Sequence, residues 1–193
     1  MEKKHRLVMA TNNLHKLKEA RAIIGDAFEL VSLTEAGVSE DLPETSDTLE
    51  GNALQKARRV YELTGLDCFA DDTGLMVDAL GGAPGVYSAR YAGGDGHDAE
   101  ANMKKLLAEL EAHDNRAAHF STVIALIRGG REEIFEGRVD GRIARERSGA
   151  NGFGYDPVFV ADETGLPFAE MSEEAKNAIS HRGRALRAMI AAL

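Results

Sequence analysis

The sequence contains a single cysteine, Cys68, among 193 residues. An intramolecular disulfide is therefore impossible, and a cysteine-rich zinc site is excluded. Long hydrophobic runs are missing as well. The first apolar run, residues 7–10, is too short for the core of a signal peptide, and no stretch approaches the length of a membrane span. We therefore expect a cytoplasmic protein that does not insert into a membrane.

Basic residues are outnumbered: Lys and Arg total 23, Asp and Glu total 32, and the formal net charge is −9. Proteins that bind nucleic-acid polymers gain most of their affinity from a basic surface, so this balance argues against such a partner. Residues 22–55 contain no Lys or Arg but eight acids, whereas residues 128–147 contain six arginines. Acidic segments beside basic ones suit a small anion bound through a divalent cation; the alternative is ordinary solvated surface charge.

Two common nucleotide and hydrolase signatures are also lacking. No G-x-x-x-x-G-K-[ST] motif occurs, which excludes a P-loop NTPase, and no G-x-S-x-G supports a serine hydrolase.

Hydrophobic periodicity and turn residues predict alternating strands and helices in the first half of the chain. Strands then pair as a hairpin closed by Gly129 and Gly130. We therefore predict one α/β domain over residues 1–193, with a mixed sheet flanked by helices, two lobes that change near residue 115, and a ligand cleft between them. The expected strands are 6–10, 28–33, 68–70, 119–128, 134–142 and 155–160; the expected helices are 14–24, 48–64, one after Asp98, and the chain from Ser172 onward.

A first candidate site lies where the first strand meets the first helix. The free N–H groups and positive dipole of a helix N-terminus attract anions, and amide side chains and a lysine add donors. This favours phosphate binding, and an Asn-capped helix with an ordinary surface lysine is an equally good interpretation. The segment consists of Thr11, Asn12, Asn13, Leu14, His15 and Lys16.

A second candidate site is the carboxylate pair Asp71 and Asp72, which follows an apolar strand and precedes Thr73. Adjacent like charges are costly unless a cation or hydrogen-bond donors offset them. Mg²⁺ needs only one or two protein carboxylates when substrate phosphate supplies the rest. Glu44 could supply a further carboxylate, while Lys56 falls on a predicted helix where a surface position is the simpler interpretation.

Two later segments could contact the rest of a nucleotide. Glycines around Phe153 and Tyr155 let the backbone approach a ligand, and the two rings can stack on a base or fill a core. Near the end of the chain, Lys176 precedes the neighbours His181 and Arg182. Arginine donors match the O6 and N7 acceptors of a purine.

Together these segments resemble the inosine triphosphate pyrophosphatase family, which hydrolyses non-standard purine nucleoside triphosphates. The matching pieces occur in family order across nearly the whole chain, at residues 10–13 with Lys16 and Glu19, 42–45, 52–53, 56–57, 70–75, 80–91, 153–157 and 180–182. One departure is Ala175, where the family pattern has an acid before Lys176. It questions an ion pair that steadies this lysine.

The resemblance implies an elongated sheet, a homodimer, and Mg²⁺-dependent hydrolysis of ITP, dITP and XTP to the monophosphate and pyrophosphate. It implies that Asp72 accepts the proton and binds the metal with Glu44. It also implies substrate contacts from Thr11, Asn12, Asn13, Leu14, His15, Lys16, Thr73, Phe153, Gly154, Tyr155, Asp156, Lys176, His181 and Arg182. A 6-oxo purine would accept from Arg182, whereas the amino group of adenine would leave that donor unpaired.

Two other functions stay open from sequence. A non-catalytic nucleotide sensor would bind ITP without hydrolysis, although a pure binder gains little from clustering Asp71 and Asp72 beside a polyphosphate. A hydrolase of modified pyrimidine nucleotides would prefer substrates such as dUTP, which the His181 and Arg182 pair does not favour.

Overall fold

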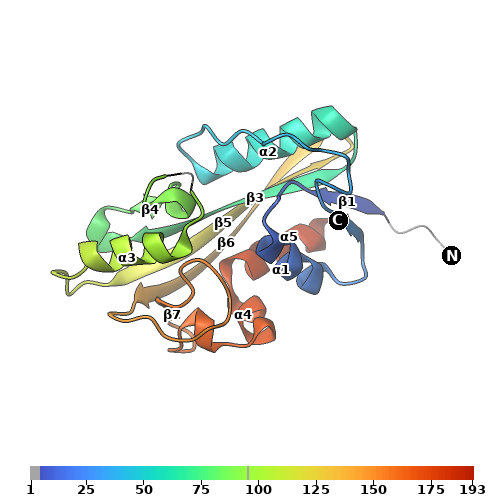
Figure 1. Ribbon diagram of the computed structural model, residues 1–193. Coiled ribbons are helices and arrows are strands. Elements are labelled where there is room, and N and C mark those ends of the chain that lie inside the picture. Colours follow the sequence, from blue (N-terminus) through green and yellow to red (C-terminus); the bar gives the residue numbers. More distant parts are fainter. Residues whose placement is uncertain (1–4, 95) are drawn as a thin grey trace. The chain divides into compact units, whose positions relative to one another are not determined.

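The computed structural model describes residues 5–94 and 96–193 (Figure 1). The chain divides into two compact units. The first comprises the described part of Met1–Asp72 together with Thr122–Gly137 and Arg182–Leu193. The second comprises Thr73–Ser121 and Arg138–His181. The predicted change near residue 115 stays a prediction.

The predicted α/β class with a mixed sheet is confirmed. Within the described residues the sheet has seven strands in the order β2-β1-β3-β5-β6-β7, and β4 pairs with β3. β1 runs parallel to β2 and β3, whereas β3–β4 and β6–β7 are antiparallel. The elements are β1 (Arg6–Met9), α1 (Leu14–Ile24), β2 (Glu29–Val31), α2 (Leu49–Thr64), β3 (Cys68–Val77), β4 (Pro84–Gly85), α3 (Ala99–Glu109), β5 (Ala117–Arg128), β6 (Arg131–Ile143), β7 (Phe159–Ala161), α4 (Glu173–Ile179) and α5 (His181–Ala192).

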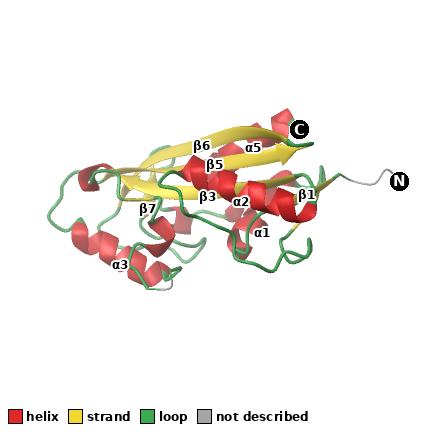
Figure 2. Cartoon of the chain, turned by 90° about the horizontal axis from the view of Figure 1, so that it is seen from above, coloured by secondary structure: helices red, strands yellow, loops and turns green. Residues whose placement is uncertain are grey.

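Unit 1 has two hydrophobic cores, one on each face of its strands. Successive strand residues point to opposite faces, so β1 sends Val8 to one core and Leu7 and Met9 to the other. α2 covers the first face, and α1 with α5 covers the second (Figures 1 and 2). The first core includes Ala53, Ala57, Val60, Cys68 and Ala70; the second includes Leu17, Ala20, Phe69, Leu186 and Met189.

Unit 2 has its own core, which is rich in aromatic rings. Phe120 packs on Phe159 with ring centroids 4.7 Å apart, and Phe159 lies 5.1 Å from Phe168. α3 adds Met103 and Leu106 to this cluster. Two candidate residues of this unit contact the cluster: Tyr155 belongs to it, and His181 stacks on Phe120.

Helix ends follow the predicted capping residues. Asn13, Thr48, Asp98 and Ser172 each accept a backbone N–H of the helix that follows. Gly65 ends α2 in the left-handed conformation, with φ of 64°. No helix in the described part of the chain has the length and apolar character needed to cross a membrane.

Two strand predictions were wrong. β3 does not end before the aspartates but continues through Asp71 and Asp72 to Val77, because basic side chains on both faces satisfy the two charges. The expected strand at 155–160 begins only at Phe159, since Tyr155 turns the chain and accepts the N–H groups of Val158 and Phe159. The apolar residues at 155–158 are buried in a turn.

Candidate active site

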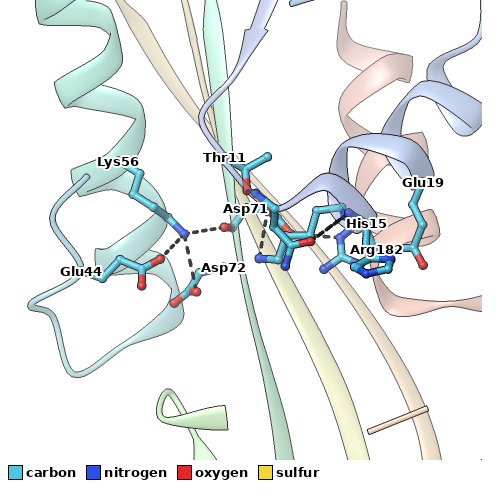
Figure 3. A network of polar contacts seen from close by, with 10 residues as sticks. Thr11, His15, Glu19, Glu44, Lys56, Asp71, Asp72 and Arg182 are labelled. Carbon is cyan, nitrogen blue, oxygen red and sulfur yellow. Dashed lines mark hydrogen bonds and ion pairs between the residues drawn. The ribbon is translucent and has the colours of Figure 1, made fainter. Parts of the chain in front are cut away.

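Asp71 and Asp72 lie side by side in β3, yet their carboxylates serve different faces. Asp72 contacts Lys56 on the face of α2 (Figure 3). Asp71 contacts Lys16 on the face of α1 and α5. This follows from the two-residue period of a strand. Each aspartate therefore has its own lysine partner, which offsets its charge as the sequence required. They build two separate clusters within unit 1.

The Asp71 cluster is a buried chain of alternating charges. Lys16 Nζ lies 3.3 Å from Asp71 Oδ1, and Arg182 Nε donates to Asp71 Oδ2 at 3.0 Å. Arg182 also donates to Glu19, which α1 places one turn after Lys16 (Figure 3). The side chains of Asp71 and Arg182 are 1% and 2% exposed, and that of Lys16 is 17% exposed. Lys16 is thus the member of this cluster nearest to solvent.

Charge pairing decides the protonation of this cluster. Burial raises the pKa of Asp71, but Lys16 and Arg182 outweigh it and hold that pKa well below its usual range. For Lys16 the order is reversed: burial lowers its pKa, and Asp71 only partly restores it. Burial lowers the pKa of Arg182, and Asp71 and Glu19 more than offset this. Asp71 is therefore a fixed negative charge that holds two cations.

The Asp72 cluster is centred on Lys56. Its ammonium donates to Glu44 Oε1 at 2.6 Å and to the backbone oxygen of Asp71 at 2.8 Å, and it lies 3.7 Å from Asp72 Oδ1 (Figure 3). Asn52 lies one turn before Lys56 on α2, accepts the N–H of Ser46 at 2.9 Å, and hydrogen-bonds Asp72. α2 thereby fixes both the strand carboxylate and the loop that carries Glu44.

Asp72 differs electrostatically from its neighbour. Burial raises the pKa of Asp72; Lys56 and Lys16 lower it in part, Glu44 raises it again, and the net pKa is raised. The carboxylates of Asp72, Glu44 and Asp71 also keep the pKa of Lys56 raised against the effect of burial. A carboxylate with a raised pKa holds a proton more readily, which is what a general base requires.

The Asp72 cluster can accommodate a divalent cation. Its donors are carboxylate oxygens, which hard cations prefer, and Asp72 Oδ2 is buried with no hydrogen-bond partner in the described residues. Across those same residues, no three His, Cys, Asp or Glu side chains gather into a metal-holding group. Two carboxylates with substrate phosphate and water therefore suit Mg²⁺, whereas an all-protein cage is not present in this part of the chain.

The loop before α1 caps that helix and leads to Lys16, which belongs to the Asp71 cluster. Asn13 Oδ1 accepts the N–H groups of His15 and Lys16, and Thr11 Oγ1 accepts the N–H of Asn13. These bonds confirm that Asn13 caps α1, and phosphate binding by the segment stays a prediction. Lys16 is not an ordinary surface lysine, however, because its ammonium turns to Asp71. Leu14 is 76% exposed.

Unit 2 gathers the other candidates around a buried ion pair. Lys176 Nζ lies 2.6 Å from Asp156 Oδ2, which also accepts the N–H of Phe153 at 2.9 Å. The ammonium lies 4.9 Å from the centre of the Phe153 ring. His181 stacks on Phe120, with ring centroids 4.5 Å apart. Asp156 thus supplies the acid that Ala175 does not, from a distant part of the sequence.

The structure therefore brings the sequence candidates together in two groups. Thr11 to Lys16, Glu44, Asp72 and Arg182 belong to unit 1, and Thr73, Phe153 to Asp156, Lys176 and His181 belong to unit 2. The parts played by Glu19, Asn52 and Lys56 were missed. The helical spacing of Asn52 and Lys56 offers one signal for their shared face, but nothing local pairs either with Asp72.

Comparison with known proteins shows which family this chain belongs to. The model of the Ham1 family matches residues 7–192. A dITP/XTP pyrophosphatase of Porphyromonas gingivalis is 55% identical over 182 residues, covering 94% of this chain and 93% of the relative. One of Flavobacterium johnsoniae is 49% identical over 185 residues, covering 96% of each. The solved HAM1 protein of Coxiella burnetii superposes with a TM-score of 0.88 at 41% identity, covering 97% of this chain and 98% of that one. The chain belongs to the Ham1 family.

Proposed function

We propose that this protein hydrolyses non-standard purine nucleoside triphosphates, ITP, dITP and XTP, to the nucleoside monophosphate and pyrophosphate in the cytoplasm. The observation that carries the proposal is the Asp72 cluster, where a buried carboxylate of raised pKa meets Lys56 and Glu44. The names of the curated relatives, dITP/XTP pyrophosphatase, support the same reaction and substrate class.

In this proposal Asp72 accepts the proton of the water that attacks the α-phosphorus. The bond between the α-phosphorus and the bridging oxygen breaks, and pyrophosphate leaves with the bridging oxygen. Lys56 holds Asp72 in place through their 3.7 Å contact, and Asn52 adds a hydrogen bond. Positioned proton acceptors of this kind contribute about 10²- to 10⁴-fold in rate.

Mg²⁺ is the cofactor that the residues fit, with Asp72 and Glu44 as its protein ligands. When bound, it would neutralise phosphate charge and lower the pKa of coordinated water. Glu44 is the more accessible ligand, since its side chain is 33% exposed against 12% for Asp72.

The substrate contacts divide between the two groups of side chains. Thr11, Asn12, Asn13, Leu14, His15 and Lys16 are proposed to contact the triphosphate, with Lys16 as the cation that meets the departing pyrophosphate. Thr73, Phe153, Gly154, Tyr155, Asp156, Lys176 and His181 are proposed to bind the nucleoside. Arg182 takes a different part from the base contact expected from sequence. Its guanidinium is buried against Asp71 and Glu19, so we assign it to hold Asp71, and through it Lys16.

Replacing Glu44 by glutamine should weaken the metal dependence specifically. The variant keeps its size and a hydrogen-bond acceptor for Lys56 but loses the carboxylate charge that a cation needs. We expect the Mg²⁺ concentration for half-maximal rate to rise at least about tenfold, with much of the rate recovered at saturating Mg²⁺. Magnesium titrations of ITP hydrolysis measure this. Glu40→Gln, which removes a surface partner of Arg59, is the matched control. An unchanged magnesium midpoint for Glu44→Gln would remove Glu44 from the metal site.

The proposed function is tested by incubating the purified protein with ITP, XTP, dGTP, dUTP and ATP in Mg²⁺ and quantifying products. We expect ITP and XTP to yield equimolar monophosphate and pyrophosphate, with ATP and dUTP far slower. Release of orthophosphate in place of pyrophosphate, or tight ITP binding without hydrolysis, would overturn it. The active form is proposed to be a homodimer, which sedimentation measures.

A further inference from the structure

The segment at residues 80–91 matches the family pattern but has no part in the proposed chemistry. Within it, Ser88 is only 6% exposed. Its hydroxyl accepts the N–H of Leu75 at 2.9 Å and donates to the backbone oxygen of Gly85 at 2.6 Å. Its backbone oxygen accepts the hydroxyl of Tyr155 at 2.6 Å. One buried serine is therefore bonded both to β3 and to a turn nearly seventy residues away.

Two of the three partners of Ser88 lie beside residues proposed to bind the nucleoside. Leu75 follows Thr73 by two positions on β3, and Tyr155 lies in the turn that carries Phe153 and Asp156. Tyr155 is 6% exposed, its hydroxyl is occupied by this bond, and burial raises the pKa of its phenol. Tyr155 is thus suited to anchor the turn rather than to meet a ligand through its hydroxyl.

Several contacts hold the turn, and one of them is a backbone bond from the N–H of Ala169 to the oxygen of Asp156 at 3.1 Å. Asp156 accepts the N–H of Phe153 and pairs with Lys176, which fixes the end that faces the ammonium. Tyr155 anchors the other end to Ser88. If the anchor is lost, the Phe153 ring and the Asp156–Lys176 pair keep their local contacts but are held less firmly relative to Thr73. Binding of the nucleoside would weaken, while the phosphate-binding residues of unit 1 would be unaffected.

We propose that Ser88 is a positioning residue for nucleoside recognition, which sets the Phe153–Asp156 turn against β3 through the Tyr155 hydroxyl. The proposal rests on the proposed function, because it assigns the nucleoside to that turn. It makes Ser88 a determinant of substrate affinity and selectivity that touches neither the reacting atoms nor the metal ligands.

The test compares Ser88→Ala and Tyr155→Phe with the wild type. For each variant we expect KM for ITP to rise about five- to tenfold, with kcat within twofold. Tyr155→Phe removes the bond to the backbone oxygen of Ser88, and Ser88→Ala removes the hydroxyl bonds to Leu75 and Gly85. The inhibition constant of inorganic tripolyphosphate, which lacks a nucleoside, should stay unchanged. The double variant should lose little more than either single variant, because Ser88→Ala breaks the link from β3 to residue 88 and Tyr155→Phe breaks the next link, from residue 88 to the turn. The matched control is Tyr91→Phe, in the same 80–91 segment. It removes a phenol hydroxyl that is bonded to Glu109 of α3, and its KM should stay unchanged.

The outcomes separate the two proposals. An unchanged KM in Tyr155→Phe, which preserves the ring and its packing, would overturn the positioning role. An equal loss for ITP and tripolyphosphate would also overturn it, since a general structural defect affects both. If the wild type does not hydrolyse ITP, the proposed function fails. Calorimetric ITP affinities of the same variants would still decide whether Ser88 positions the nucleoside.

Discussion

Replacing Asp72 by asparagine is expected to lower kcat for ITP by about 10²- to 10⁴-fold while the fold is retained. The amide has the same shape, and Lys56 keeps Glu44 and the backbone oxygen of Asp71 as partners. The amide cannot accept the proton of the attacking water, and it is a weaker ligand for a cation. Steady-state kinetics at saturating Mg²⁺ and ITP measure the loss, and circular dichroism confirms the fold.

The matched control is Asp78→Asn, which makes the same chemical change at an exposed aspartate of unit 2. It should leave kcat unchanged. If Asp72→Asn retained more than about a tenth of the wild-type kcat, Asp72 would not be the proton acceptor, because a positioned general base contributes far more than that.

Asp71→Asn is expected to lower the free energy of unfolding at pH 7 by about 3–5 kcal/mol. The change leaves the buried guanidinium of Arg182 with Glu19 as its remaining carboxylate and leaves Lys16 without its ion-pair partner. Removing one member of a buried charge network costs much more than the network contributes as a whole, because the remaining charges stay desolvated. Urea denaturation followed by circular dichroism measures the difference.

The control for Asp71 is Asp140→Asn, which breaks an ion pair with Arg138 whose two side chains are more than half exposed. Exposed pairs contribute about 0–1 kcal/mol, so this variant should unfold almost like the wild type. A loss below about 1 kcal/mol for Asp71→Asn would show that the network does not stabilise the fold.

The stabilisation that Asp71 provides through Lys16 and Arg182 depends on pH with a definite sign. The folded-state pKa of Asp71 is depressed, so its stabilisation is present above the unfolded-state value of about 3.9 and is lost as the pH falls through the folded value. The stability difference between wild type and Asp71→Asn should therefore be full at pH 7 and shrink below about pH 4. A difference that grows on acidification would contradict the pairing.

Sequence reasoning predicted the local structure of this protein well. Caps at Asn13, Thr48 and Asp98 and the hairpin at Gly129 and Gly130 depend on residues close in sequence, so their signals are local. The same reasoning failed at Asp71 and Asp72, where it ended a strand that continues to Val77. Two adjacent charges are typical of the end of a strand, and the cations that allow Asp71 inside β3 lie 55 residues before it and 111 residues after it. The cation beside Asp72 is Lys56 of α2.

Long-range pairing also explains the site residues that were only partly understood. Lys176 pairs with Asp156, 20 residues away in sequence, so this lysine has an ion-pair partner although Ala175 is not an acid. Arg182 was expected to face a purine because arginine donors match the O6 and N7 acceptors, whereas in the structure Arg182 donates to Asp71 and Glu19. No local pattern encodes such contacts, since they depend on which helix covers which face of the sheet.

The central claim is that Asp72 directs water to the α-phosphorus of a purine triphosphate, and hydrolysis of ITP in ¹⁸O-labelled water tests it most directly. The account expects a single labelled oxygen in the inosine monophosphate and unlabelled pyrophosphate, with both products lost in Asp72→Asn. Label in the pyrophosphate, or release of orthophosphate, would show attack at another phosphorus and contradict the account.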